Sequence, residues 1–262
     1  MIKSISIIAF VVLILVTANC YAEKTSFNAL RVAHAGGGIN GKTYTNSYEA
    51  LNLNLKKGFT YFEVDFSFTR DNRLVCLHDW QDSFKRSFGF QTGEKASIET
   101  FKYLSRNASE FTKCTLEGLA EWMEKNPAAI IVTDVKEDNL LALSMISKKI
   151  KDYQKRVIPQ IYQPQNYNIV KKMGFKSVIW TLYRFQGSMP EVIRRSKAFR
   201  GAFAITMPKG LASTGFPGLL ASKGIPTYVH TVNSAEEMKI FKKKYKITEV
   251  YTDFLSPLSG KK

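Results

Sequence analysis

Residues 61–80 read YFEVDFSFTRDNRLVCLHDW, and this stretch decides which fold the sequence predicts. Residues 61–69 and 73–78 are rich in aromatic, β-branched and aliphatic side chains. The polar segment between them carries turn residues, so the stretch predicts a β-hairpin. Asp71 and Asn72 tolerate the positive φ that a two-residue hairpin loop needs, which makes them the predicted loop.

The predicted hairpin brings two carboxylates and an imidazole together. With that loop, Asp65 lies opposite His78, with Cβ atoms roughly 5 Å apart, and Glu63 lies on the same face by period-two alternation. A buried unpaired carboxylate is costly, and two neighbouring carboxylates repel each other. The three residues therefore form a candidate site that needs a counter-charge, and a structural ion pair with lysine or arginine is the simpler alternative.

Strand-like and helical patterns alternate along the rest of the chain. Strands are predicted at residues 30–34, 61–66, 129–135, 157–162, 177–183, 201–207, 225–232 and 249–254, and helices at 47–57, 116–125, 140–153, 166–173, 190–196, 217–223 and 235–244. Eight strands joined by helical crossovers predict an α/β fold, a (β/α)8 TIM barrel, with an open doubly wound sheet as the alternative. The hairpin is then an excursion at the top of the second strand, and residues 84–112 are a small insertion.

The N-terminal segment has the pattern of a secretory signal peptide. Residues 1–22 contain Lys3, a following apolar run, and small residues leading to Ala22. Cleavage after Ala22 leaves residues 23–262 as a periplasmic or secreted domain. An uncleaved N-terminal membrane anchor and a lipoprotein signal ending at Cys20 are the alternatives.

A large positive charge indicates which partners the protein favours. The chain has 262 residues, enough for one large domain, and a formal net charge of +16, which falls to +15 when the single lysine of residues 1–22 is removed. Such a balance favours anionic partners such as phosphate esters or an anionic membrane surface. The sequence has no zinc finger, helix-turn-helix or aromatic-basic interleaving, so nucleic acid is not expected as a partner.

Two cysteines, Cys76 and Cys114, remain after the predicted cleavage. Cys76 lies within a predicted strand, which favours a buried thiol. An exported protein also permits a disulfide. Because Cys76 lies within a strand, we expect a buried free thiol and not a disulfide.

Polar residues are placed where a barrel carries its active site. In barrels of this type, catalytic groups lie at the C-terminal ends of the strands. All three histidines of the chain, His34, His78 and His230, fall near predicted strand ends. Asp134 and Lys136 close the strand predicted at residues 129–135. These residues are therefore expected to converge on one mouth of the barrel.

These residue types suit the cleavage of a phosphodiester. Its transition state is stabilised by a cation at the nonbridging oxygens and by a proton donor at the leaving oxygen. A carboxylate cluster supplies the oxygen ligands that hard divalent cations prefer. Two imidazoles can exchange acid and base roles near neutral pH. Attack can come from water or from an adjacent hydroxyl of the substrate, which would give a cyclic phosphate.

Four segments together resemble a known family. Residues 34–79 read HAGGGINGKTYTNSYEALNLNLKKGFTYFEVDFSFTRDNRLVCLHD, and TDVK, HTVN and YTDF follow at residues 133–136, 230–233 and 251–254. These motifs resemble those of the glycerophosphodiester phosphodiesterases, over essentially the whole chain after the signal segment. The resemblance implies catalytic roles for His34 and His78. It implies that Glu63, Asp65 and Asp134 bind a divalent cation, Mg²⁺ or Ca²⁺, and that Lys136 contacts phosphate. His230 is expected to have either a substrate contact or a core role.

The chain also departs from the family pattern. The arginine that follows the first histidine in the family is Ala35 here, so a bidentate grip on phosphate is missing. The Pro-Glu before the first helix is Tyr44-Thr45, the third ligand is Asp134 where glutamate is usual, and His230 stands where tryptophan is usual. An aspartate followed by x-Lys also resembles the sphingomyelinase D and phospholipase D toxins of the same barrel type.

Other residues near the mouth have simpler interpretations. Gly36–Gly38 is either a turn or a run of backbone N–H donors that partly replaces the missing arginine. Asn46 and Ser47 are expected to cap the first helix. Three aromatic residues are expected to pack the barrel rather than line a headgroup pocket: Trp180, Tyr183 and Tyr228.

We therefore expect an exported, metal-dependent phosphodiesterase that hydrolyses glycerophosphodiesters to glycerol phosphate and an alcohol by histidine acid-base catalysis. A lipid phosphodiesterase of the sphingomyelinase D or lysophospholipase D type is one alternative. A catalytically degenerate phosphate-binding barrel is the other, and Ala35 is its main support.

Overall fold

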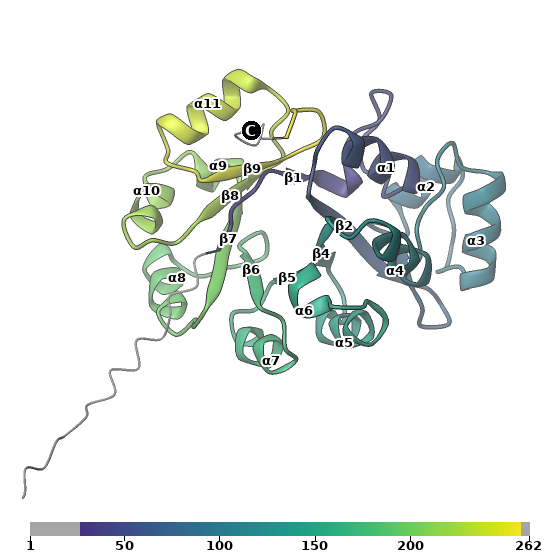
Figure 1. Cartoon of the computed structure of the whole chain (residues 1–262), viewed down its shortest axis with the longest axis horizontal. Helices are drawn as coiled ribbons and strands as arrows, with labels where there is room; N and C mark the ends of the chain where they lie inside the picture. The colour runs from purple at the N-terminus through teal and green to yellow at the C-terminus, as the bar shows by residue number, and fades with distance from the viewer. Residues whose placement is uncertain (1–26, 258–262) are drawn as a thin grey trace, which may run out of the picture.

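Eight parallel strands close into a barrel in the computed structural model, which describes residues 27–257 of the chain (Figure 1). The strands are β1 (Val32–Ala33), β2 (Tyr61–Phe68), β4 (Ile130–Val135), β5 (Val157–Ile161), β6 (Ser177–Thr181), β7 (Ala202–Pro208), β8 (Thr227–His230) and β9 (Glu249–Thr252). Each strand pairs in parallel with the next, and β1 pairs with both β2 and β9, which closes the ring. The predicted (β/α)8 TIM barrel is therefore confirmed, and the open sheet is excluded.

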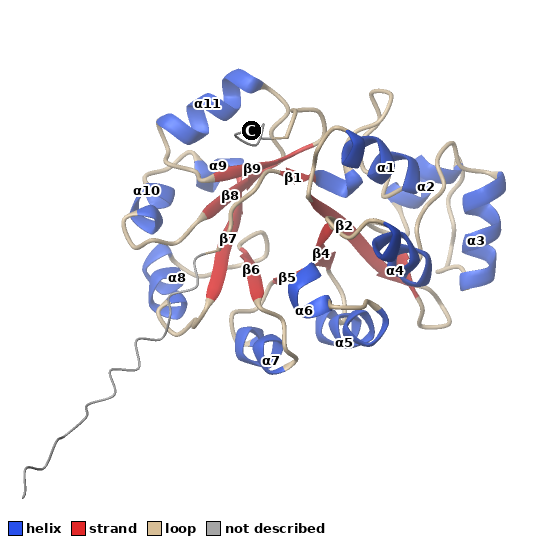
Figure 2. Cartoon of the chain, in the orientation of Figure 1, coloured by secondary structure: helices blue, strands red, loops and turns tan. Residues whose placement is uncertain are grey.

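Helices lie around the outside of the strands (Figure 2). They are α1 (Tyr48–Lys56), α2 (Asp82–Phe88), α3 (Ile98–Asn107), α4 (Leu116–Lys125), α5 (Asn139–Lys149), α6 (Tyr153–Arg156), α7 (Asn166–Lys172), α8 (Met189–Ser196), α9 (Lys209–Ala212), α10 (Phe216–Ala221) and α11 (Ala235–Lys243), with a 3-10 turn, η1, at His34–Gly36. Every predicted helix is present, but the one predicted over residues 140–153 ends at Lys149. It ends there because Ile150 is extended and Asp152 adopts a left-handed φ of 54°.

The predicted signal peptide, residues 1–22, lies outside the described residues. Within residues 27–257, no helix combines the length and the apolar character needed to cross a membrane.

The barrel interior changes from apolar to polar along the strands. Period-two alternation puts Tyr61, Glu63 and Asp65 on one face of β2. Tyr61 belongs to an apolar cluster formed by residues from many strands: Phe27, Val32, Tyr61, Val132, Ile158, Ile179, Ala202, Ala204, Tyr228 and Tyr251. Glu63 and Asp65 lie further along β2, toward its C-terminal end. The two carboxylates are therefore held beyond an apolar layer, at the mouth that the sequence predicts.

The loop of the hairpin is longer than predicted. It consists of Arg70–Asn72, because Thr69 donates its backbone N–H to Arg73 O at 2.8 Å across the loop. Asn72 adopts a φ of 55°, a conformation that asparagine tolerates better than most residues. The loop therefore has three residues, and the prediction of a two-residue loop is wrong.

The longer loop shifts the register of the hairpin by one residue. β3 (Leu74–Cys76) pairs antiparallel with β2, with Phe66 opposite Cys76. Extrapolated by one step, this register puts Leu77, and not His78, opposite Asp65. The predicted cross-strand pair of Asp65 and His78 is therefore wrong. His78 nevertheless lies at the mouth. It follows the end of β3, where the chain no longer pairs with β2 and its side chains no longer alternate with those of β2.

Cys76 and Cys114 form a disulfide, so the prediction of a buried thiol is wrong. The segment before α4 runs beside β3, where Cys76 donates its backbone N–H to Cys114 O at 2.8 Å. This pairing brings the two Cα atoms to 5.0 Å, which is within the range that a disulfide requires. Strand position alone could not reveal the partner, because 38 residues separate the two cysteines.

Residues 84–112, predicted as an insertion, include most of α2 and all of α3, which lie beside the barrel at the right of Figure 1. They share a small apolar cluster with β3: Val75, Leu77, Trp80, Phe84, Phe88, Ile98 and Phe101. This cluster fixes the segment that follows β3, and with it the position of His78.

Candidate active site

A cavity of about 280 Å³ at the C-terminal ends of the strands is lined by all seven predicted site residues. They are His34 in η1, Glu63 and Asp65 on β2, His78 after β3, Asp134 and Lys136 at the end of β4, and His230 at the end of β8. We call this space the site cavity. The sequence therefore identified residues that the fold brings together from five places in the chain.

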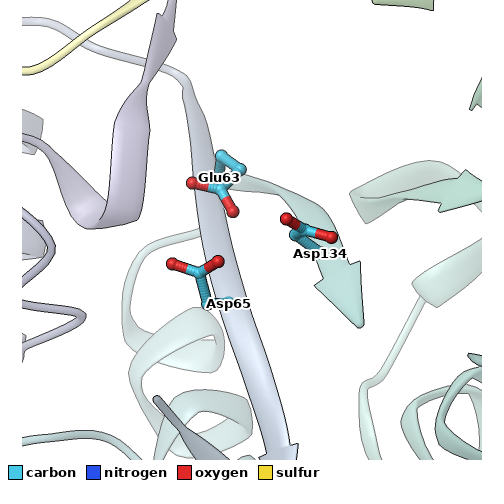
Figure 3. A group of neighbouring side chains, drawn as sticks. All are labelled: Glu63, Asp65 and Asp134. Atoms are coloured by element: carbon cyan, nitrogen blue, oxygen red, sulfur yellow. The ribbon is translucent and has the colours of Figure 1, made fainter. Parts of the chain in front are cut away.

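The three carboxylates face one another from two neighbouring strands (Figure 3). Asp65 and Asp134 are register partners in the pairing of β2 with β4, and Glu63 precedes Asp65 by two residues. One oxygen from each carboxylate lies within 4.8 Å of the others, and all three residues are buried. Such a group is unfavourable without positive charge beside it.

Lys136 supplies part of that charge. Its Nζ donates to Asp65 Oδ1 at 3.1 Å and to Asp134 Oδ2 at 2.7 Å. Burial lowers the pKa of Lys136, but the charges of Asp65 and Asp134 outweigh burial and raise the pKa above its usual value. Lys136 is therefore a stable cation, which compensates one of the three carboxylates.

Hydrogen bonds and nearby positive charges keep Asp65 ionised. Burial raises the pKa of Asp65, but the charges of Lys136, His78 and His34 and a hydrogen bond from Asn46 lower it to about 2. Asn46 Nδ2 donates to Asp65 Oδ2 at 2.9 Å, and Asn46 Oδ1 accepts the backbone N–H of Asp65 at 3.0 Å. Asn46 therefore holds Asp65 and does not cap α1. Ser47 caps the helix, because its side chain accepts the backbone N–H of Ala50.

Glu63 is the least compensated carboxylate. It accepts the backbone N–H of Ala35 at 2.7 Å, and in the described part of the chain no lysine or arginine nitrogen lies within 4.0 Å of it. Burial and the charges of Asp65 and Asp134 raise the pKa of Glu63 well above its usual value, although the charge of His34 opposes the shift. An added cation would therefore stabilise ionised Glu63 most.

His34 is held by a carboxylate from the far end of the chain. Its Nδ1 lies 2.9 Å from Asp253 Oδ1, and both side chains are buried. Asn233 fixes Asp253, because its Nδ2 donates to Asp253 Oδ2 at 2.7 Å and its Oδ1 accepts Asp253 N–H at 2.7 Å. The HTVN and YTDF motifs therefore position His34 and leave its Nε2 for other partners.

His78 has a similar arrangement with its neighbour in sequence. Its Nδ1 lies 2.7 Å from Asp79 Oδ2, and the pair is partly exposed. Asp79 Oδ1 in turn accepts the backbone N–H groups of Gln81 and Ser83 at 3.0 and 2.9 Å, at the start of α2. The two candidate catalytic histidines are thus each oriented through Nδ1 by an aspartate.

His230 is neutral and unpaired at its inner nitrogen. Its Nε2 is buried and has no hydrogen-bond partner within residues 27–257. Burial, together with the positive charges of His34 and Lys136, lowers the pKa of His230 to about 3. Because His230 lines the site cavity, a substrate contact is favoured over a core role for this residue.

The glycine run has most of its N–H groups bound within the protein, which limits the part it can take in replacing the missing arginine. Gly37 donates its N–H to His34 O and Gly38 donates to Asp253 O, both at 2.7 Å. A Cβ at Gly38 would lie 2.2 Å from the Phe254 ring, so this run is needed for close packing. Two of its three N–H groups are already bound within the protein.

Tyr44, which the sequence marked only as a departure from the family pattern, also lines the site cavity, as do Tyr162 and Arg184, which the sequence did not single out. Tyr162 donates its hydroxyl hydrogen to Asp134. Arg184, on the exposed loop after β6, donates from Nη1 to Lys136 O at 2.9 Å, and its Cζ lies 5.1 Å from the Tyr162 ring. A guanidinium has five donors, and within residues 27–257 the bond to Lys136 O is the one hydrogen bond that Arg184 makes, so further donors can bind a ligand. The sequence did contain a signal for Arg184, because this basic residue directly follows the strand predicted at residues 177–183.

The aromatic residues expected to pack the barrel divide into two groups. Trp180 and Tyr228 are fully buried in the apolar clusters, as expected. Tyr183 is 48% exposed and lines the site cavity, so the expectation is wrong for this residue. It lies beyond the end of β6, where the strand no longer directs side chains into the core.

Comparison with known proteins places the chain in a family. Residues 34–256 match the model of the glycerophosphoryl diester phosphodiesterase family. The chain therefore belongs to that family, and its predicted class, a phosphoric diester hydrolase, is confirmed. Among curated proteins, no sequence matches the chain.

Solved structures of similar fold have low sequence identity to the chain. A glycerophosphodiester phosphodiesterase from Thermotoga maritima is 23% identical, with a TM-score of 0.64 over 86% of this chain and 95% of that one. A glycerophosphoryl diester phosphodiesterase from Parabacteroides distasonis is 15% identical, with a TM-score of 0.65 over 89% and 85% of the two chains. A phosphodiesterase from Oleispira antarctica, solved with the product sn-glycerol-3-phosphate, is 13% identical, with a TM-score of 0.66 over 86% and 93%. These similarities support the barrel fold.

Proposed function

We propose that the protein is an exported, divalent-cation-dependent phosphodiesterase that hydrolyses glycerophosphodiesters to glycerol phosphate and an alcohol. The observation that carries the proposal is the single cavity that combines three facing carboxylates with two histidines, each oriented by an aspartate. The product bound to the Oleispira antarctica phosphodiesterase, sn-glycerol-3-phosphate, supports glycerol phosphate as the product here.

The carboxylates fit a hard divalent cation such as Mg²⁺ or Ca²⁺. Glu63, Asp65 and Asp134 offer oxygen ligands within 4.8 Å of one another. Lys136 compensates one of the three charges, which leaves a net negative site centred near Glu63. A bound divalent cation would supply positive charge to the nonbridging oxygens of the phosphate.

The two histidines are suited to proton transfer. Burial lowers the pKa of His34, but the hydrogen bond to Asp253 and the charges of Glu63, Asp253 and Asp65 raise it to about 9. A protonated His34 can donate a proton from Nε2, and His78, which is nearer to solvent, can accept one from the attacking group. A positioned acid or base of this kind typically contributes 10²- to 10⁴-fold in rate.

Arg184 and Lys136 are the proposed phosphate contacts. Lys136 is bound to two carboxylates, so it contributes charge but has few donors left. Arg184 makes one backbone hydrogen bond and retains the paired donors that suit phosphate. We therefore assign to Arg184 the contact that the family makes with the arginine missing at Ala35. His230, which lines the same cavity, would contact the substrate beside the phosphate.

Two features support export. Residues 1–22 have the signal-peptide pattern. The disulfide between Cys76 and Cys114 suits an oxidising compartment, because structural disulfides are rare in reducing ones. The positive net charge also suits an anionic membrane surface as the place where lipid-derived substrates occur.

Phosphorus NMR of purified protein tests the substrate class. The protein is incubated with Mg²⁺ or Ca²⁺ and with glycerophosphocholine, glycerophosphoethanolamine, glycerophosphoglycerol, lysophosphatidylcholine or sphingomyelin. Glycerol phosphate should appear from the glycerophosphodiesters and should be absent with the His78→Ala variant. Turnover of lysophosphatidylcholine or sphingomyelin alone would assign the protein to the lipid phosphodiesterase type. Lack of turnover throughout would favour the degenerate barrel that Ala35 suggests.

A further inference from the structure

A second cavity, of about 230 Å³, lies beside the site cavity. It is formed by the loop before α1, the end of α2 and the segment before α4. Tyr44 lines both cavities. The proposed hydrolysis uses none of the charged residues of this second cavity.

The Tyr44 ring forms part of the wall of both cavities. On one side, its centroid lies 4.6 Å from that of His34 and 5.3 Å from that of His78, with both histidine rings nearly perpendicular to it. Arg86 Cζ lies 5.3 Å from the same centroid. Tyr44 adopts a φ of 56°, which is unusual for a bulky residue and shows that the surroundings hold it in place. One aromatic ring therefore lies between the two histidines and a cluster of positive charge.

The second cavity has more positive than negative charge. Lys42 and Glu110, both exposed, approach each other at 4.0 Å and compensate each other. Arg86 and Lys113 remain, and within residues 27–257 neither has a carboxylate oxygen within 4.0 Å. Arg86 Nη2 donates to Ser83 Oγ at 2.9 Å, and its other donors have no partner in the part of the chain that the structure describes.

Lys113 is a buried lysine that makes no ion pair with a carboxylate of residues 27–257. It is 6% exposed, and its Nζ donates to Thr45 O, the one acceptor that it has in the described chain. An ammonium group has three donors, and a buried charge is costly unless it is paired. Burial, and then the positive charge of Arg86, lower the pKa of Lys113 to about 8, although the charges of Asp65 and Glu49 oppose the shift. An anion between Arg86 and Lys113 would remove the repulsion between them and satisfy their free donors.

We propose that the second cavity binds a second phosphate group, carried by the alcohol part of the substrate, with Arg86 and Lys113 as its ligands. This inference rests on the proposed function, because it places the scissile phosphate next to His34 and His78. The volume is several times the roughly 30 Å³ that one water occupies in the liquid, so a phosphate group fits. The guanidinium of Arg86 suits phosphate oxygens, which it can bind in a bidentate manner. The preferred substrates are then glycerophosphodiesters whose alcohol is itself phosphorylated.

Two matched substrates test this inference: glycerophosphoglycerol and the same diester phosphorylated on the terminal hydroxyl of one glycerol. The protein should prefer the phosphorylated diester, measured as a ratio of kcat/KM values. Arg86→Met and Lys113→Met should each lower that ratio at least about tenfold, the loss expected for one charge-assisted contact. Lys85→Met, an exposed neighbour on α2 that lines neither cavity, should leave the ratio unchanged. Arg86 is exposed, so Arg86→Met should fold even if Lys113→Met does not, and it then tests the inference alone.

Two further measurements separate this inference from the proposed function. Calorimetry of both diesters with chelator-treated protein measures their affinity without turnover. The phosphorylated diester should bind more tightly, and Arg86→Met should remove this difference. That result supports the inference even if hydrolysis fails. Equal kinetics and equal binding of the two diesters would overturn it. The inference would also be overturned if inorganic phosphate changed the rate of glycerophosphoglycerol hydrolysis, if Arg86→Met abolished this effect, and if the phosphorylated diester were not preferred. The second cavity would then bind free phosphate and not a phosphate group of the substrate.

Discussion

His34 Nδ1 lies 2.9 Å from Asp253 Oδ1, so the first strand of the barrel and the last are joined by a buried histidine-aspartate pair. The pair lies just beyond the pairing of β1 with β9, at the mouth of the barrel, and orients the Nε2 of His34. It also ties the stability of the fold to the protonation of a proposed catalytic residue.

The pH dependence of stability should reveal this pair. The pKa of His34 is raised from 6.5 to about 9, so its stabilising contribution is complete below about pH 6.5 and is lost as the pH rises through about 9. The shift corresponds to at most ~3 kcal/mol. Urea unfolding of chelator-treated protein should therefore show a difference between wild type and Asp253→Asn that is largest near pH 6 and shrinks toward pH 10. A difference independent of pH would show that His34 is not the titrating group.

Removal of either proposed acid-base residue should reduce turnover. His34→Ala and His78→Ala should each lower kcat by at least about 10²-fold, because each change removes a proton-transfer partner. Circular dichroism should remain native in both variants. If one variant retains nearly wild-type turnover of glycerophosphoglycerol, that histidine takes no part in the reaction.

Loss of Arg184 should weaken phosphate binding. A charge-assisted hydrogen bond is worth ~1.5–3 kcal/mol, so Arg184→Met should lower kcat/KM by about tenfold or more. Lys136→Met should cost a few kcal/mol of transition-state binding and should also change cation affinity, since Lys136 contacts two of the carboxylates. Arg194→Met, an exposed change on α8, is the control. Unchanged kinetics in Arg184→Met would mean that another group replaces the missing arginine.

The disulfide should stabilise the hairpin and the segment before α4. Because 38 residues separate Cys76 from Cys114, removing the cross-link in the double Cys→Ala variant should lower the free energy of unfolding by about 2–4 kcal/mol. Urea denaturation of the oxidised wild type and the double variant measures the loss. Equal stability would indicate that the cross-link is absent from the purified protein.

The sequence predicted the barrel and the site because both depend on local patterns. Strand and helix periodicity placed β2 and β4. Alternation within the hairpin placed Glu63 and Asp65 on one face, and a strand end placed Asp134. Distant contacts were harder to predict. The disulfide partner of Cys76 depends on a segment that returns to β3 after two helices.

The hairpin shows how a local error can leave the site intact. Loop length set the wrong partner for Asp65, because Asp71 and Asn72 do not reveal that Arg70 also belongs to the loop. His78 nevertheless lines the site cavity, since it lies beyond the ladder and is positioned by Asp79 and α2. The sequence marked Tyr44 only as a departure from the family pattern, because its place between the rings of His34 and His78 and the second cavity depends on the fold.

The central claim is that Glu63, Asp65 and Asp134 bind a divalent cation on which hydrolysis depends. Calorimetric titration of the chelator-treated protein with Mg²⁺ and with Ca²⁺, alongside activity at each cation concentration, tests it most directly. The wild type and the exposed control Glu124→Gln should bind a cation, gain thermal stability and recover activity together. Glu63→Gln and Asp65→Asn should bind more weakly and need a higher cation concentration. Full activity in chelator, with no heat of cation binding, would contradict the account and leave the carboxylates as a structural ion-pair network with Lys136.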